Sequence, residues 1–116
     1  MDREAAVAGR FYPARREEIL RALAALVPPG EGAAPAVAVL APHAGYVYSG
    51  AVAGATYARV EVPARAVVLC PNHTGLGERA ALWPDGAWRT PLGRVPVDAE
   101  LTAALRACPG VREDRL

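Results

Sequence analysis

The chain has 116 residues, of which 53% are hydrophobic and 22% are charged, and its formal net charge at pH 7 is +1. This length suits one domain with a single hydrophobic core. The apolar content excludes an intrinsically disordered segment, and the near-neutral charge excludes the basic surface typical of proteins that bind nucleic acid or anionic membranes.

The cysteine content and the N-terminus bear on location. Cys70 and Cys108 are too few and too far apart for a disulfide framework. Met1 is followed by charged residues rather than by an apolar signal segment, and proline and glycine interrupt the apolar runs well short of a membrane span. We therefore expect a cytoplasmic protein.

The sequence predicts three helices. In residues 15–27 the apolar side chains recur at helical spacing, and Pro28 ends the segment. Residues 49–60 carry small side chains on one helical face, which would let this helix approach a sheet closely. Residues 99–107 form the third predicted helix, with Asp98 as its N-cap.

Two short apolar runs, residues 37–40 and 66–70, are predicted to be buried strands, each followed by a proline. With the helix between them they form a βαβ unit, so the two strands are expected to be parallel. The predicted fold class is therefore α/β. In the second strand Cys70 is expected to be a small buried thiol.

A hairpin is predicted further along the chain. Residues 81–83 and 87–89 flank the turn sequence Pro84-Asp85-Gly86, and Trp83 and Trp88 are expected to pack on this hairpin. Residues 90–93 form a further turn.

The two predicted strands end alike: an apolar run is followed by a proline, a histidine, one small residue and a glycine. His43 and His73 are the two histidines of the chain. Because ligand sites of α/β sheets lie at the carboxyl ends of parallel strands, we expect the two imidazoles to converge on a metal ion. Gly45 and Gly75 would allow a sharp turn with positive φ after each histidine.

Three neighbouring residues each have two interpretations. Tyr46 either donates a hydrogen bond near the metal, as a catalytic residue, or packs as an aromatic ring. Asn72 either orients a ligand or water molecule or caps its own turn. Ser49 is either the N-cap of the second helix or a nucleophile, although no nucleophile elbow surrounds it.

Four segments, in order and at suitable distances, closely resemble the successive motifs of the Memo family, whose bacterial and archaeal members are labelled AmmeMemoRadiSam system protein B. They are Ala8-Gly9-Arg10-Phe11-Tyr12-Pro13, residues 42–50, residues 71–77, and Trp88-Arg89-Thr90-Pro91-Leu92-Gly93 with Val97-Asp98. The resemblance spans nearly all of the 116 residues.

The resemblance implies a fold similar to the LigB-type class III extradiol dioxygenases, with a mixed, largely parallel sheet flanked by helices. It also implies that His43 and His73 are metal-site residues for iron or copper. The family's third ligand, a cysteine far downstream, has no counterpart here. Residues 1–116 are therefore interpreted as one partial Memo-like domain that lacks its C-terminal half, and an exposed apolar face is expected.

Two functions follow as hypotheses. The first is a metal-binding protein with redox activity at a histidine-based iron or copper site, resembling non-haem iron dioxygenases. The second is a non-catalytic module that binds a peptide or protein in the same crevice. The resemblance implies a radical-SAM enzyme and an AMMECR-type protein as partners.

Overall fold

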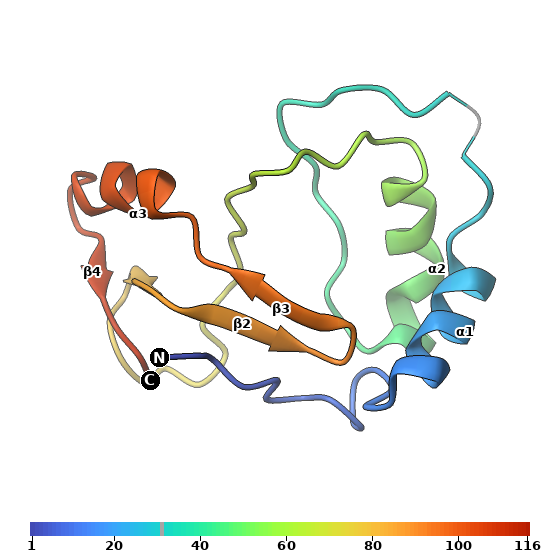
Figure 1. The fold of residues 1–116 in the computed structure, drawn as a ribbon, viewed down its shortest axis with the longest axis horizontal. Coiled ribbons are helices and arrows are strands. Elements are labelled where there is room, and N and C mark those ends of the chain that lie inside the picture. The colour runs from blue at the N-terminus through green and yellow to red at the C-terminus, as the bar shows by residue number, and fades with distance from the viewer. Residues whose placement is uncertain (31) are drawn as a thin grey trace. The chain divides into compact units, whose positions relative to one another are not determined.

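A computed structural model describes residues 1–30 and 32–116 of the chain. The chain divides into two compact units. The helical unit comprises residues 5–64 and 90–92, and the terminal unit comprises residues 1–4, 65–89 and 93–116. The helices and strands, most of them labelled in Figure 1, are α1 (Arg16–Leu26), α2 (Tyr46–Tyr57), β1 (Ala81–Leu82), β2 (Ala87–Thr90), β3 (Gly93–Pro96), α3 (Ala99–Arg106) and β4 (Arg112–Glu113).

The helical unit is built on the contact between α1 and α2, which lie side by side (Figure 1). The prediction of α1 is confirmed, and its apolar face buries Ile19. The second predicted helix is also present, although it begins at Tyr46 rather than at Ser49. Gly54 of α2 lies directly against the last turn of α1, because a Cβ added there would be 2.0 Å from the Leu26 carbonyl oxygen. The small face of α2 therefore packs closely, but on a helix and not on a sheet.

The segment before α1 is tied to the start of α2. Gly9, with φ +78°, closes a tight turn by donating its N–H to the Tyr12 carbonyl at 2.7 Å. The N–H of Tyr46 then donates to the Phe11 carbonyl at 2.8 Å. This bond satisfies one of the free N–H groups at the first turn of α2.

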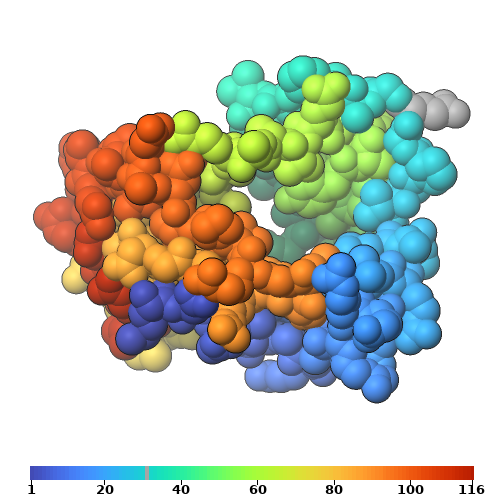
Figure 2. Space-filling model, viewed as in Figure 1, coloured from blue at the N-terminus to red at the C-terminus, as the bar shows by residue number. Residues whose placement is uncertain are grey.

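The two buried strands predicted from the apolar runs are absent, so the predicted βαβ unit is not formed. Residues 37–40 and 66–70 have no regular secondary structure, and most of their side chains are exposed. Figure 2 shows residues of the first run, in teal, at the surface. The physical reason is that a strand requires a neighbour to accept and donate its backbone hydrogen bonds, and none of the described residues pairs with either run.

The two runs lie in different units, so the single exposed apolar face expected from the sequence stays a prediction, but the side chains of both runs are exposed. Their exposed apolar residues are Val37, Val39, Leu40, Val67, Val68 and Leu69. The prediction that Cys70 is a buried thiol is wrong, because this residue is exposed.

The terminal unit contains two short sheets. In one, β1 and β4 are parallel, with Ala81 opposite Arg112 and Leu82 opposite Glu113. The third predicted helix, α3, is present, and the Asp98 carboxylate accepts a hydrogen bond from the N–H of Leu101 at 2.9 Å. The N-cap prediction is therefore confirmed.

The predicted hairpin between residues 81–83 and 87–89 is wrong, as the second sheet shows. β2 pairs with β3 across the turn at residues 91–92, and not with β1. On its other edge β2 pairs with the N-terminal segment, since Arg3 donates to the Ala87 carbonyl and accepts from the N–H of Arg89, both at 2.8 Å. Met1 occupies the space beside Gly86, where a Cβ would lie 2.2 Å from the Met1 carbonyl oxygen. The N-terminal residues thus take the place that a folded-back β1 would need.

The two tryptophans pack against each other, although the hairpin on which they were expected to pack is not formed. The ring centroids of Trp83 and Trp88 are 6.4 Å apart in an edge-to-face arrangement. The Arg3 guanidinium carbon lies 5.1 Å and 4.9 Å from the two ring centroids, so a cation completes the cluster.

The fold is thus mixed α/β, with helices and short parallel and antiparallel sheets. In the part of the chain that the structure describes, no helix is both long and apolar enough to cross a membrane.

Candidate functional site

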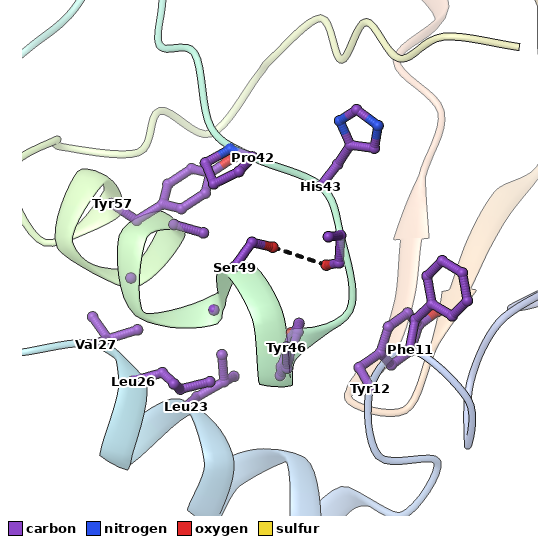
Figure 3. A pocket seen from close by; sticks show the side chains of 14 residues that line it. Phe11, Tyr12, Leu23, Leu26, Val27, Pro42, His43, Tyr46, Ser49 and Tyr57 are labelled. Atoms are coloured by element: carbon purple, nitrogen blue, oxygen red, sulfur yellow. Dashed lines mark hydrogen bonds between the residues drawn. The ribbon is translucent and has the colours of Figure 1, made fainter. Parts of the chain in front are cut away.

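His43 belongs to the helical unit and lies on the loop that leads into α2. It lines a cavity of about 350 Å³ (Figure 3). The rest of the wall is mainly apolar and aromatic, and it comes from the segment before α1, from α1 and from α2. The aromatic members are Phe11, Tyr12, Tyr46 and Tyr57, and the aliphatic members are Leu23 and Leu26 of α1 and its C-cap residue Val27.

Tyr46 is part of this wall and packs against a second tyrosine. Its ring centroid is 5.8 Å from that of Tyr12, with the ring planes tilted by 39°. Burial raises the pKa of the Tyr46 phenol, with a smaller contribution from Tyr12, because both disfavour the phenolate. The phenol is therefore a proton-bearing group that can donate a hydrogen bond into the cavity at neutral pH. Aromatic packing is present, and the catalytic role of Tyr46 stays a prediction.

Ser49 is not the N-cap of α2. The N-cap of α2 is Gly45, whose φ of −55° also corrects the expected positive φ at this position. Ser49 lies within the first turn of the helix and donates its hydroxyl to the Ala44 carbonyl at 3.0 Å (Figure 3). In the same view the His43 imidazole projects away from Ser49. The hydroxyl therefore holds the His43 loop against the helix.

A glycine is needed at position 45 because the backbone packs closely there, and not because the chain makes a left-handed turn. A Cβ added at this position would be 3.3 Å from the Phe11 carbonyl oxygen. The small residue thus lets the loop after His43 approach the segment before α1.

His73 belongs to the terminal unit and lies in an exposed turn organised by Asn72. The Asn72 Oδ1 atom accepts hydrogen bonds from the N–H of Thr74 at 3.0 Å, from the Thr74 hydroxyl at 2.9 Å and from the N–H of Gly75 at 3.0 Å. Its Nδ2 donates to the Leu76 carbonyl at 2.6 Å. Gly75 has φ +69°, as expected for the residue that lets the chain turn after the histidine.

The Asn72 side chain therefore caps its own turn, which is one of the two interpretations of the sequence. All of its contacts given above are to the turn itself. Its direct role toward a ligand or water molecule stays a prediction.

The two histidines lie in different units, each described by itself, so their convergence on one metal ion stays a prediction. Within residues 1–30 and 32–116, the structure shows no group of three or more histidine, cysteine, aspartate or glutamate side chains suited to hold a metal ion. Cys108 lies beyond the end of α3, where its thiol donates to the Ala104 carbonyl at 3.7 Å.

Sequence reasoning missed two residues of the cavity wall, Phe11 and Tyr12. Their signal was present in the motif Gly9-Arg10-Phe11-Tyr12-Pro13, in which two adjacent aromatic residues follow a glycine turn. The turn at Gly9 directs this aromatic pair toward α2, a contact that no local pattern in the sequence specifies.

The comparisons with known proteins point to one family. The family model described as Memo-like protein matches residues 3–115. A MEMO1 family protein of Thermotoga neapolitana is 42% identical over 120 residues, which cover 90% of this chain and 43% of the relative. Another, of Methanopyrus kandleri, is 45% identical and covers 100% of this chain and 46% of the relative. A third, of Aeropyrum pernix, is 46% identical over 84% of this chain and 40% of the relative. The chain thus spans less than half the length of these curated relatives.

Proposed function

The chain belongs to the Memo family, and from this premise we propose that it contributes His43 and His73 to one metal site that takes iron or copper. The observation that carries the proposal is the repeated motif: each histidine lies in a short exposed loop held by a hydrogen bond from a neighbouring side chain, that of Ser49 for His43 and that of Asn72 for His73. These hydrogen bonds restrict the backbone of the loops that carry the two imidazoles.

The donor chemistry fits a transition metal. Neutral imidazole is a borderline ligand that suits iron, copper and zinc, and two imidazoles leave positions open for water or a further ligand. When bound, iron or copper would supply redox chemistry. Among this chain's own residues, Tyr46 would donate a hydrogen bond from its protonated phenol, and the apolar wall beside His43 would exclude water.

The finer fold is part of the same proposal. We propose that the family fold of the longer relatives is a largely parallel sheet flanked by helices, similar to LigB-type dioxygenases. Each exposed apolar run supports this, because exposed apolar surface normally marks a place that other parts of a protein cover.

Calorimetric titration with Cu(II) and Zn(II) tests the metal site. We expect one ion per chain, and we expect His43→Ala and His73→Ala each to abolish binding, because a shared ion loses half of its protein ligands in either variant. A chain with both Cys70→Ser and Cys108→Ser serves as the background that removes thiol binding, and it should bind as the unmodified chain does. Unchanged binding in either alanine variant, or two ions that each depend on one histidine, would overturn the shared site.

A second candidate function is favoured by the cavity beside His43. Its wall is mostly apolar, and four aromatic residues line it, which is typical of sites that bind apolar side chains of a peptide or protein. In this alternative the chain is a binding module, and an AMMECR-type protein or a radical-SAM enzyme is the proposed partner.

The alternative is tested by binding of these partners in the presence of a metal chelator. Ala53 lines the cavity, whereas Ala55 of the same helix is exposed and does not. We expect Ala53→Leu to weaken partner binding and Ala55→Leu, the matched control, to leave it unchanged. Equal binding by both variants would exclude the cavity as the docking site.

A further inference from the structure

We propose that Asn72 is a positioning residue for His73: its side chain closes the turn that carries the histidine and so fixes the place from which the imidazole reaches a metal ion. The inference rests on the proposed metal site and adds to it a residue that does not itself contact the ion. It is carried by hydrogen bonds within the terminal unit.

The first step is the number of contacts that one side chain makes. Asn72 Oδ1 accepts from three donors on Thr74 and Gly75, at 2.9 to 3.0 Å, while Nδ2 donates to the Leu76 carbonyl at 2.6 Å. The amide therefore bonds to the chain on the far side of His73 and holds the histidine between its own backbone and these partners. A further hydrogen bond, from the N–H of Leu76 to the Thr74 hydroxyl at 3.1 Å, supports the same turn.

The second step is that the far end of this loop is also anchored. The N–H of Glu78 donates to the Asp114 carboxylate at 2.7 Å, and a Cβ at Gly77 would lie 2.2 Å from the same oxygen. Asp114 directly follows β4 and is joined to β1 through a bond from its N–H to the Leu82 carbonyl at 3.1 Å. The loop after His73 is thus attached to the sheet of β1 and β4 at one end, and the hydrogen bonds of Asn72 hold it at the other.

The third step is energetic. The turn is exposed, so each neutral hydrogen bond contributes little to global stability. Groups that orient a metal ligand nevertheless change metal affinity by about 10- to 100-fold when they are removed. Loss of Asn72 should therefore affect metal binding far more than folding.

The test combines a metal-free measurement with metal affinity. In amide hydrogen exchange of the metal-free chain, we expect Asn72→Ala to accelerate exchange at Thr74 and Gly75. The N–H of Leu101, capped by Asp98 in the same unit, is the internal control and should stay unchanged. Asn72→Asp should restore slow exchange, because a carboxylate oxygen accepts the same three hydrogen bonds.

In titration with Zn(II), we expect Asn72→Ala to weaken binding about tenfold, with the stoichiometry and the thermal midpoint unchanged. Thr74→Val, which removes one donor to Asn72 and the acceptor of the Leu76 N–H but keeps the two backbone contacts to Asn72, should weaken it less. This milder variant also keeps the test decisive if Asn72→Ala fails to fold.

The outcomes separate the two proposals. If His73→Ala leaves Zn(II) binding unchanged, the proposed metal site fails. If His73→Ala abolishes binding while Asn72→Ala binds Zn(II) within twofold of the unmodified chain, or exchanges at Thr74 and Gly75 at unmodified rates, the positioning role of Asn72 is wrong and the metal site stands.

Discussion

Arg94 donates two hydrogen bonds to Asp2, one to each carboxylate oxygen, from Nε at 2.7 Å and from Nη2 at 2.8 Å. Arg89 lies beside the same carboxylate, with Nε 3.4 Å from Oδ2. Two-point pairing of this kind is the geometry in which a guanidinium binds a carboxylate best. The pair joins the N-terminal segment to β3, within the terminal unit, across 92 residues of sequence.

The first prediction concerns the pH dependence of stability. The two hydrogen bonds from Arg94, with a weaker contribution from the one from Arg89, hold the pKa of the Asp2 carboxyl well below its usual range. A lowered folded-state pKa stabilises the fold above the unfolded value of about 3.9 and loses that contribution as the pH falls below it. We therefore expect Asp2→Asn to lower the midpoint of urea unfolding at pH 7, and we expect its difference from the unmodified chain to shrink between about pH 5 and pH 2.

Glu4→Gln is the control for this experiment. Glu4 is mostly exposed and lies 3.5 Å from Arg89, so its removal should leave the unfolding midpoint nearly unchanged. A difference between Asp2→Asn and the unmodified chain that is constant from pH 7 to pH 2 would contradict the assignment.

The second prediction concerns the contact between α1 and α2. In an ordinary helix interior, Gly→Ala stabilises by about 0.5–1 kcal/mol. At Gly54 the new Cβ would meet the Leu26 carbonyl oxygen at 2.0 Å and its carbon at 2.7 Å, and backbone atoms cannot move aside without shifting the helix. We expect Gly54→Ala to destabilise by about 1–3 kcal/mol, measured by urea unfolding.

Gly50→Ala gives the matched comparison. Its Cβ would meet a terminal carbon of the Leu26 side chain at 2.7 Å, and this side chain can change rotamer. Its loss of stability should be clearly smaller than that of Gly54→Ala, and equal losses would show that the helices do not pack as described.

The third prediction separates two roles of Asp98. Its carboxylate caps α3 through the N–H of Leu101 and also pairs with Arg65, whose Nε and Nη2 lie 2.6 and 2.8 Å away. Both contacts lower the pKa of the carboxyl, Arg65 more strongly. Asp98→Ala should lower the thermal midpoint and the helical signal of α3 more than Asp98→Asn, because the amide oxygen still caps the helix. Equal effects of the two substitutions would assign the whole contribution to the ion pair.

The fourth prediction concerns the thiols. Cys70 and Cys108 are both exposed, so both should react with a thiol reagent such as 5,5′-dithiobis(2-nitrobenzoic acid) in the absence of denaturant. We expect two thiols per chain, and one in each of Cys70→Ser and Cys108→Ser. Reaction at Cys70 only after unfolding would show that residues 66–70 are covered, as the sequence pattern alone suggests.

Elements encoded by neighbouring residues were predictable from the sequence. The apolar spacing of α1, the small residues of α2 and the Asp98 cap of α3 are local features, since a helix satisfies its backbone hydrogen bonds within itself. The positive φ of Gly75 was also predictable, because this residue belongs to a local turn. Gly45, in the matching motif, is instead the N-cap of α2 and lies against Phe11.

The strands were not predictable in this way. An apolar run such as residues 66–70 has the composition of a buried strand, but burial and pairing depend on segments that are distant along the chain. β2 illustrates the point, because its partners are β3 on one edge and Arg3 on the other, whereas the turn sequence at Gly86 favoured a hairpin with β1. With β3 and Arg3 both paired to β2, β1 pairs with β4 instead.

The family of the chain and the two loops that carry His43 and His73 could be predicted from the sequence, because motif and turn residues are adjacent along the chain. Which side chains surround these loops depends on how distant segments pack together. The aromatic wall beside His43 forms because a turn at Gly9 brings Phe11 and Tyr12 to α2. Such contacts join residues separated by tens of positions, and their free energy depends on the packing of the whole unit rather than on any local pattern.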